Sequence, residues 1–329
     1  IGFCISVYTV ATSYNMATIG QYDKGSEAIP RARRVVSYDG TALAYTCHGP
    51  AASGAPVTVL FTHGFGSGAA LWDAQIPALV RRGYRCITWD MRGHAASQSP
   101  KANDDTAPHR YSKWSQVMDM KAVLAAAGVV PLHARRHVGE TVLVLAGHSM
   151  GGMDTMLFAC HFPGVADALV LYGTGPGFRS DKGRLKWNAT AEKIAAKYDR
   201  QGLDALVGSD RTKGHTSAAG LAAACRGNFA QRDDDPYAMA RGGPNFLARE
   251  GLAQIAQPTV ILIGQYDKGF GRASDMMTKA LPEARLARIP GAGHMMCEKN
   301  SDAFNAALLD GLDWAVAAVA KHRKVRSRL

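Results

Sequence analysis

The segment G-H-S-M-G at positions 147–151 is the feature that most constrains how this chain can fold. Apolar residues dominate positions 141–146 just before it, as expected of a buried parallel strand. An apolar run typical of a helix follows from Met153 to Phe162. A chain that passes from strand to helix in so few residues must turn tightly, and side chains at the flanking positions would collide with the neighbouring element. Glycine at 147 and 151 removes both collisions.

Such a turn holds the hydroxyl of Ser149 clear of its surroundings, beside backbone N–H groups that favour negative charge. G-x-S-x-G between a buried strand and a helix is typical of a nucleophile elbow. The pattern alone is weak, because glycine and serine are common residues. The strand before it and the helix after it are what predict that Ser149 is a catalytic nucleophile.

A serine hydroxyl attacks only when a base removes its proton and an acid orients that base. His294 lies in G-A-G-H, just after a predicted strand over 285–289, where small residues let a loop fold back. Asp267 lies four residues past a predicted strand over 259–263. The order Ser149, Asp267, His294 is the one expected when the nucleophile stands on an elbow of this kind.

Other residues of the same types fit less well. Any one of the eleven histidines is more often structural than catalytic, and only the glycine-rich turn after a late strand favours His294. Asp275 falls on a predicted helix, and Asp302 caps the last helix. We expect His63, His94 and His148 to pack and fix loops. Asp90 and Arg92 are expected to brace their loop through a charged hydrogen bond.

The tetrahedral intermediate of such a reaction carries an oxyanion that needs two donors. The backbone N–H of Met150 follows from the elbow itself, and that of Phe65 in H-G-F-G at 63–66 is predicted as the second. H-G-F-G is also consistent with a plain turn from strand to helix.

Strand and helix patterns alternate along most of the chain, which predicts an α/β fold with a mostly parallel sheet covered by helices on both faces. Strands are expected over 33–46, 57–62, 84–89, 142–146, 168–172, 259–263 and 285–289. Helices are expected over 71–82, 113–127, 153–162, 275–281 and 303–321. We predict an N-terminal extension over 1–28, a core over 29–177 and 257–322, a helical cap over 178–256 and a basic tail over 323–329.

The net charge of +11 is only a weak sign of nucleic-acid binding, because most of the excess positive charge lies in two short segments. Five positive charges lie in the segment 321–328 and three more among positions 31–34, and the rest of the chain is close to balanced. The six cysteines are scattered without paired spacing, which favours free thiols over a disulfide framework. The histidines show no metal-ligand spacing, and no apolar run approaches the roughly 20 residues of a membrane helix.

Taken in order, H-G-F-G, D-M-R-G-H-x-x-S, G-H-S-M-G-G, G-x-x-D and G-A-G-H resemble the α/β-hydrolase superfamily of serine esterases and lipases over about residues 33–320. The resemblance implies an eight-stranded sheet and a helical cap after the sixth strand, and we expect neither a cofactor nor a metal. It also carries over Ser149 as nucleophile, Asp267 as acid, His294 as base, and Phe65 and Met150 as oxyanion donors. Ala95 departs from the family, which usually has glycine there.

The expected reaction is hydrolysis of a small-molecule carboxylic ester through an acyl-enzyme. Phe178, Trp187 and Phe229 suggest a pocket for an acyl or small aromatic group. The same triad serves C–C bond hydrolases, thioesterases, acyltransferases and cofactor-free perhydrolases, and a ligand-sensing protein without turnover is a further alternative. The oligomeric state does not follow from the sequence.

The C-terminal tripeptide is expected to bear on location rather than chemistry. Ser327-Arg328-Leu329 resembles the S-K-L peroxisomal address, although a solvated basic helix end is the commoner explanation for such a tail, so cytoplasmic and peroxisome-type locations both stay open. The segment I-G-Q-Y-D-K-G occurs at 19–25 and again at 263–269, and only the second copy follows a strand pattern.

Overall fold

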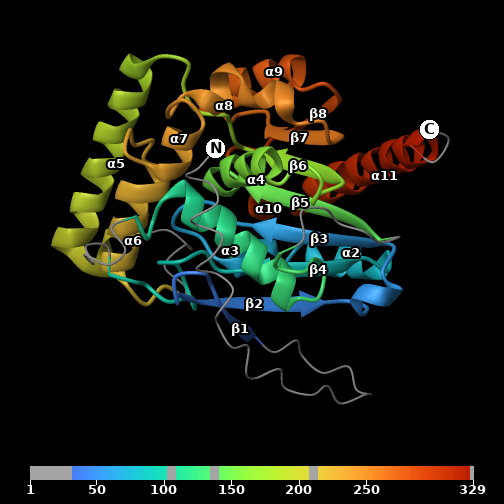
Figure 1. The fold of residues 1–329 in the computed structure, drawn as a ribbon, viewed down its shortest axis with the longest axis horizontal. Coiled ribbons are helices and arrows are strands. Elements are labelled where there is room, and N and C mark those ends of the chain that lie inside the picture. Colours follow the sequence, from blue (N-terminus) through green and yellow to red (C-terminus); the bar gives the residue numbers. More distant parts are fainter. Residues whose placement is uncertain (1–31, 102–108, 134–140, 207–213, 327–329) are drawn as a thin grey trace. The chain divides into compact units, whose positions relative to one another are not determined.

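Eight strands form one sheet in the order β1-β2-β4-β3-β5-β6-β7-β8 in this computed structural model (Figure 1). The structure describes residues 32–101, 109–133, 141–206 and 214–326. The strands are β1 Arg33–Val36, β2 Ala42–His48, β3 Val57–Thr62, β4 Arg85–Trp89, β5 Val142–His148, β6 Ala168–Tyr172, β7 Thr259–Gly264 and β8 Ala284–Ile289. Strand β2 pairs antiparallel with β1 and β4, and the other neighbours are parallel. The mostly parallel eight-stranded sheet of the sequence prediction is confirmed.

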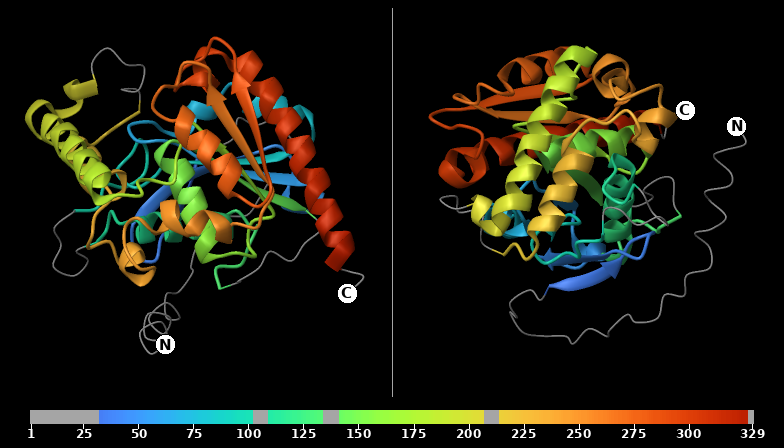
Figure 2. Two further views of the ribbon diagram at one scale, coloured as in Figure 1. Left: turned by 90° about the horizontal axis from the view of Figure 1, so that it is seen from above. Right: turned by 90° about the vertical axis from the view of Figure 1, so that its left-hand side faces the viewer.

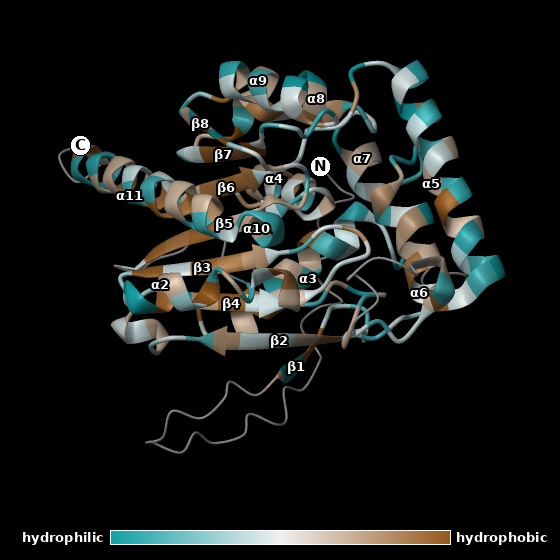
Figure 3. Cartoon of the chain, turned by 180° about the vertical axis from the view of Figure 1, so that it is seen from behind, coloured by the Kyte–Doolittle hydropathy of each residue, from teal (hydrophilic) through white to brown (hydrophobic). Residues whose placement is uncertain are grey.

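Two helical layers cover the sheet. Helices α3 (Lys113–Ala126), α4 (Met150–His161) and α9 (Gly271–Ala280) bury apolar residues on one face, and α2 (Ile76–Arg81), α10 (Met296–Lys299) and α11 (Ser301–Arg326) do so on the other. Figure 1 shows α3 and α4 on one face of the sheet, and the reverse view in Figure 3 shows α2 and α11 on the other. Strand residues alternate between these layers: Leu60 belongs to the first core, whereas Val59 and Phe61 belong to the second.

The central strands are largely brown in Figure 3, as expected of strands with buried side chains on both faces. Every residue of β3, β5 and β7 is buried. This double burial is the physical reason that these strands read as continuous apolar runs in the sequence.

A helical insertion separates β6 from β7. Its long helix α5 is far more polar than the strands of the sheet (Figure 3). It consists of α5 Asp181–Gln201, η4 Gly202–Leu206, α6 Ala218–Ala224, the π-helical turn η6 Cys225–Phe229, α7 Pro236–Ala240, α8 Phe246–Arg249 and η7 Gly251–Gln254. Two short 3₁₀ turns, η2 Ala52–Gly54 and η3 Ala69–Trp72, complete the described elements. Figure 2 shows α5 standing at the end of the sheet away from α11. The helical segment expected after the sixth strand is therefore present.

Several element boundaries differ from the sequence prediction. The expected helix over 71–82 is two elements, η3 and α2, because α2 starts at Ile76 with a proline in its first turn, where the missing N–H costs nothing. Helix α4 begins at Met150, three residues earlier than expected. Helix α11 continues to Arg326, so the first four residues of the predicted basic tail, positions 323–326, are helical.

Helix α11 is long and apolar enough to be a membrane-span candidate by composition. Its inner residues are nevertheless buried against the sheet, among them Phe304, Leu308 and Leu312. A core helix that covers a sheet has the same composition, so the candidate does not establish a membrane segment.

Three sequence predictions fall wholly or partly outside the described residues: the N-terminal extension, the first copy of I-G-Q-Y-D-K-G and the C-terminal tripeptide. The five cysteines that the structure describes are free thiols. Residues Ala32–Leu329 form one compact unit, which includes the helical insertion.

Candidate active site

The turn from β5 to α4 holds Ser149 in a strained backbone conformation, with φ +52° and ψ −117°. A Cβ atom at Gly147 would lie 2.4 Å from the carbonyl oxygen of Gly151, and one at Gly151 would lie 2.3 Å from the carbonyl oxygen of His63. Both contacts are impossible, so the two glycines are required by the close approach of backbone to backbone. This is the steric reason that the sequence pattern anticipated.

His294 and Asp267 come from the loops after β8 and β7 and meet at the carboxyl edge of the sheet. The Nδ1 atom of His294 donates a hydrogen bond of 2.8 Å to Oδ2 of Asp267. The other carboxylate oxygen accepts from the backbone N–H groups of Gly269 and Phe270, at 3.1 and 3.2 Å. Asp267 is buried and His294 is half-buried, so the carboxylate is fixed while one edge of the imidazole remains accessible.

The His294 imidazole lies beside the turn that holds Ser149. Its ring centroid is 4.7 Å from that of His148, the residue before Ser149, and Nε2 of His148 lies 3.2 Å from the carbonyl oxygen of His294. A Cβ at Gly173 would come within 3.1 Å of the His294 ring, and the φ of +52° at this position also favours glycine. The structure thus brings Ser149, His294 and Asp267 to one edge of the sheet.

The H-G-F-G loop after β3 passes against the same turn. A Cβ at Gly64 would lie 3.0 Å from Cβ of Ser149 and 2.9 Å from Nδ1 of His148. Phe65 is the next residue, and Met150 opens helix α4, where the first N–H groups have no acceptor within the helix. Both predicted oxyanion donors therefore belong to segments adjacent to Ser149.

The three predicted pocket residues form a continuous aromatic row with Phe65. Ring centroids are 4.8 Å apart for Phe65 and Phe229, 4.7 Å for Phe229 and Trp187, and 6.1 Å for Trp187 and Phe178. All four rings are half-buried. The row leads from the H-G-F-G loop into the helical insertion.

The prediction that Asp90 and Arg92 pair with each other is wrong. Asp90 accepts hydrogen bonds from the backbone N–H groups of Ala69 and Ala96, at 2.7 and 3.2 Å. Arg92 points the other way and pairs with two other carboxylates. Asp90 is held by backbone N–H groups of neighbouring loops and Arg92 by carboxylates of other segments, so nearness in sequence was a poor guide to pairing.

His63 has the loop-fixing role expected of it. Its Nε2 accepts a hydrogen bond of 2.9 Å from the backbone N–H of Met91, which ties the H-G-F-G loop to the loop after β4. The ring is fully buried, and this burial lowers the pKa of His63 to about 4. Burial also lowers the pKa of His94, whose ring centroid lies 5.1 Å from that of His63. Both rings are neutral at pH 7.

Folding stability is expected to decrease as the pH falls from 6.5 to 4. The pKa of His63 drops from 6.5 in the unfolded chain to about 4 in the folded one, so in this window the unfolded chain binds the extra proton and acid favours unfolding. For each tenfold change in proton affinity between the two states, the free energy of unfolding changes by about 1.4 kcal/mol. Urea titrations at pH 7 and pH 5 should show a smaller loss of unfolding free energy in His63→Asn than in the wild type; an equal loss would contradict the assignment.

The sequence analysis missed three residues that support the site, Phe270, Tyr172 and Thr174. Phe270 stacks on His294 with centroids 5.2 Å apart and planes 19° apart. Tyr172 stacks on His148 at 4.5 Å and so supports the ring beside His294. The hydroxyl of Thr174 donates to the backbone carbonyl of Ser149 at 2.6 Å. Their positions just after β7 and at the end of β6 were the available signal, because the carboxyl ends of parallel strands share one edge.

Ala95, where the family usually has glycine, has a φ of +40°. This left-handed conformation suits glycine and is unfavourable for a residue with a Cβ. The loop after β4 keeps that conformation despite the alanine.

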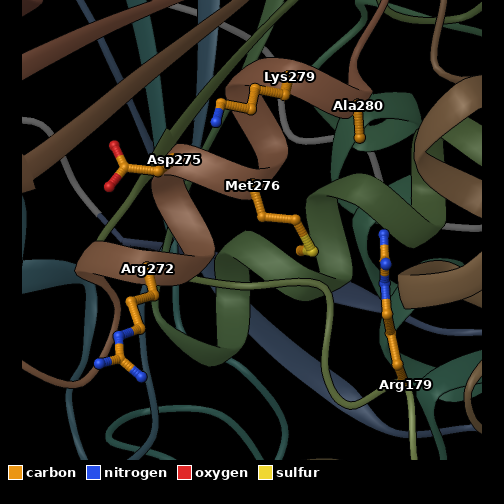
Figure 4. A pocket seen from close by; sticks show the side chains of 6 residues that line it. All are labelled: Arg179, Arg272, Asp275, Met276, Lys279 and Ala280. Atoms are coloured by element: carbon orange, nitrogen blue, oxygen red, sulfur yellow. The ribbon is translucent and has the colours of Figure 1, made fainter.

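A surface pocket of about 520 Å³ lies beside α9 (Figure 4). It is lined by Arg179, Arg272, Asp275, Met276, Lys279 and Ala280. The lining residues do not include Ser149, Asp267 or His294, which the structure also describes. Within residues 32–101, 109–133, 141–206 and 214–326, no group of three histidine, cysteine or acidic side chains is arranged to hold a metal ion.

Residues 57–301 match the family model of the α/β-hydrolase fold, which is most of the chain. The chain belongs to the α/β-hydrolase family. This α/β hydrolase is 28% identical over 293 residues to a non-heme haloperoxidase of Rhodococcus erythropolis, covering 85% of this chain and 98% of that relative.

Two solved structures with similar folds are an enol-lactonase of Burkholderia xenovorans and a thermophilic esterase of Thermogutta terrifontis with malate bound. The first has a TM-score of 0.63 at 20% identity and covers 85% of this α/β hydrolase and 100% of its own chain. The second has a TM-score of 0.66 at 20% identity and covers 87% and 99%. The relatives support a hydrolase, and the structural similarity shows the fold.

Proposed function

We propose that this α/β hydrolase cleaves a carboxylic ester through an acyl-enzyme, with Ser149 as nucleophile, His294 as base and Asp267 as the orienting acid. The observation that carries the proposal is the 2.8 Å hydrogen bond from His294 to Asp267 beside the strained turn of Ser149. A serine next to a paired imidazole and carboxylate is the arrangement that nucleophilic catalysis uses, and strained backbone is frequent at such sites.

The chemistry follows from the tautomer. A carboxylate only accepts hydrogen bonds, so the Nδ1 of His294 carries a proton and its Nε2 is left as an acceptor. Nε2 takes the proton of Ser149 as the hydroxyl attacks the ester carbonyl, and returns it to the leaving alkoxide. Water, activated by the same nitrogen, then attacks the acyl-enzyme and releases the acid. The backbone N–H groups of Phe65 and Met150 stabilise the oxyanion in both steps.

A fluorophosphonate probe tests this proposal directly, because it phosphonylates only activated serines. We expect one adduct per chain, located by peptide mass spectrometry on Ser149, and a burst of p-nitrophenol from p-nitrophenyl acetate at high enzyme concentration. His294→Ala should label far more slowly, whereas exposed Ser180, the N-cap of α5, serves as an internal control that stays unlabelled. An adduct elsewhere, or none, would contradict the proposal.

Perhydrolysis is a second candidate, which the similarity to a non-heme haloperoxidase favours. Hydrogen peroxide would then replace water in attacking the acyl-enzyme, giving a peracid and restoring the serine hydroxyl. Competition between water and hydrogen peroxide for the acyl-enzyme is measured by adding peroxide to an ester assay and quantifying acid and peracid. Acid alone would exclude this candidate and leave ester hydrolysis.

A further inference from the structure

The π-helical turn η6 brings the helical insertion into contact with the oxyanion loop. It continues α6 and closes with a bond of 3.0 Å from the N–H of Ala230 to the carbonyl of Cys225. π-Helical turns are rare and are frequent at functional sites. The last residue of this turn, Phe229, packs on Phe65, and both rings contact the core of the sheet as well as the separate apolar cluster of the insertion.

A buried ammonium group holds the turn from the side of the sheet. Lys113, at the start of α3, is buried, and its Nζ donates to the carbonyl oxygens of Asn228 and Ala230 at 2.6 and 3.4 Å. These two carbonyls flank Phe229. Burial lowers the pKa of Lys113, and the nearby carboxylates of Asp154 and Asp235 oppose that shift. A charged donor bound to backbone carbonyls is a strong restraint.

Asn228 joins this restraint to the helix that carries the nucleophile at its start. Its side-chain amide donates a hydrogen bond of 2.8 Å to Oδ2 of Asp154 on α4, and its Oδ1 lies 3.4 Å from Nζ of Lys113. All three side chains of this Asn228 network are buried. Breaking one partner in such a network leaves the others unsatisfied in a low-dielectric environment.

The insertion holds the turn from its other side. The indole N–H of Trp187 donates to the carbonyl of Phe229 at 2.8 Å. Arg184 and Asn188 both donate to the carbonyl of Gln231, at 3.0 and 2.9 Å. Four successive carbonyls, from 228 to 231, are thus fixed by side chains of α3 and α5. These bonds fix the backbone on both sides of Phe229, from which its ring packs on Phe65.

We propose that Asn228 is a positioning residue for substrate selection, which rests on the proposed ester hydrolysis. Through Asp154 and Lys113 it fixes the turn at the position where Phe229 forms a wall beside Phe65. An acyl chain attached to Ser149 meets this wall, because Phe65 belongs to the loop that supplies an oxyanion donor. The preference of the enzyme for acyl length is therefore set by a buried polar network that does not itself touch the substrate.

The test compares kcat/KM for p-nitrophenyl hexanoate and p-nitrophenyl acetate in the wild type and in Asn228→Ala. We expect the hexanoate-to-acetate ratio to fall by about tenfold or more, since misplaced apolar contacts typically cost about 10-fold to 200-fold in discrimination. The loss should appear mainly as a raised KM for hexanoate, because the wall binds the chain equally before and during reaction. Phe229→Leu, with the network intact, should shift the ratio in the same direction.

Arg226→Ala is the matched control. Arg226 lies in the same π-helical turn but pairs at the surface with Glu192 and Asp199, at 2.7 and 2.6 Å. Its replacement disturbs the turn from outside and leaves the Asn228 network in place, so we expect an unchanged ratio. Circular dichroism and thermal melting confirm folding, and Asn228→Ser replaces the alanine variant if that one does not fold.

An unchanged ratio in folded Asn228→Ala or Asn228→Ser would overturn this inference and leave the proposed function intact. An unchanged ratio in Phe229→Leu would also overturn it. Loss of discrimination in Arg226→Ala equal to that in Asn228→Ala would show a merely structural role. Hydrolysis in the wild type that does not depend on Ser149 would overturn the proposed function, and this inference with it.

Discussion

Ser149→Ala is expected to lower kcat for p-nitrophenyl acetate by about 10⁴-fold or more, because members of a catalytic triad act as a unit and the loss of the nucleophile removes the acyl-enzyme route. Folding should be unchanged, since alanine keeps the Cβ that is already accommodated at φ +52°. The measurement is initial rate against the uncatalysed rate, with a melting curve for each protein. Retention of more than about a tenth of wild-type turnover would exclude a serine nucleophile at this position.

Ser149→Gly is the matched variant that separates function from backbone strain. It lacks the hydroxyl as alanine does, but glycine adopts positive φ without a Cβ clash. We expect both variants to be inactive and the glycine variant to be more stable than the alanine variant by about 1 kcal/mol, or about 2 °C in Tm. If the glycine variant were less stable than the alanine variant, the backbone at position 149 would not be strained.

The sheet was predictable because its strands are buried on both faces. Strands such as β5 and β6 carry unbroken apolar runs, and their bounds from sequence agree with the structure to within two residues. The helix after β3 was less predictable, because the apolar pattern over 71–82 does not show where a 3₁₀ turn ends and an α-helix begins. Tertiary packing decides that boundary.

The proximity of Asp267 and His294 followed from topology, since loops after neighbouring parallel strands meet at one edge. Their roles as acid and base remain predictions. The stacking partners Phe270 and Tyr172 could not be predicted in the same way, because an aromatic ring packs on whatever surface the fold presents. Long-range polar pairs were the least predictable, as Asn228 and Asp154 are 74 positions apart.

Arg92 illustrates that limit, and its environment has a large energetic consequence. The guanidinium is fully buried and forms two hydrogen bonds with Asp119, at 2.7 and 2.6 Å, and another with Asp39 at 2.7 Å. Burial alone would raise the pKa of Asp39, but the charge and hydrogen bonds of Arg92 outweigh burial and lower it. The arginine joins the loop after β4 to helix α3 and to the turn between β1 and β2.

Arg92→Met is therefore expected to destabilise the fold by about 3–5 kcal/mol, because it leaves the buried Asp119 carboxylate without its partner. The corresponding loss in Tm is about 6–10 °C. Arg82→Ala is the control: Arg82 pairs with Asp313 at 3.1 Å, but both side chains are nearly half exposed, at 45% and 49%, so the expected change is below about 1 kcal/mol.

Adding Asp119→Asn to Arg92→Met should restore part of the lost stability, since the uncompensated charge is gone. Urea unfolding of the four proteins measures each step. Equal losses for Arg92→Met and Arg82→Ala would contradict this prediction, because the buried ion pair would then contribute no more to stability than the exposed one.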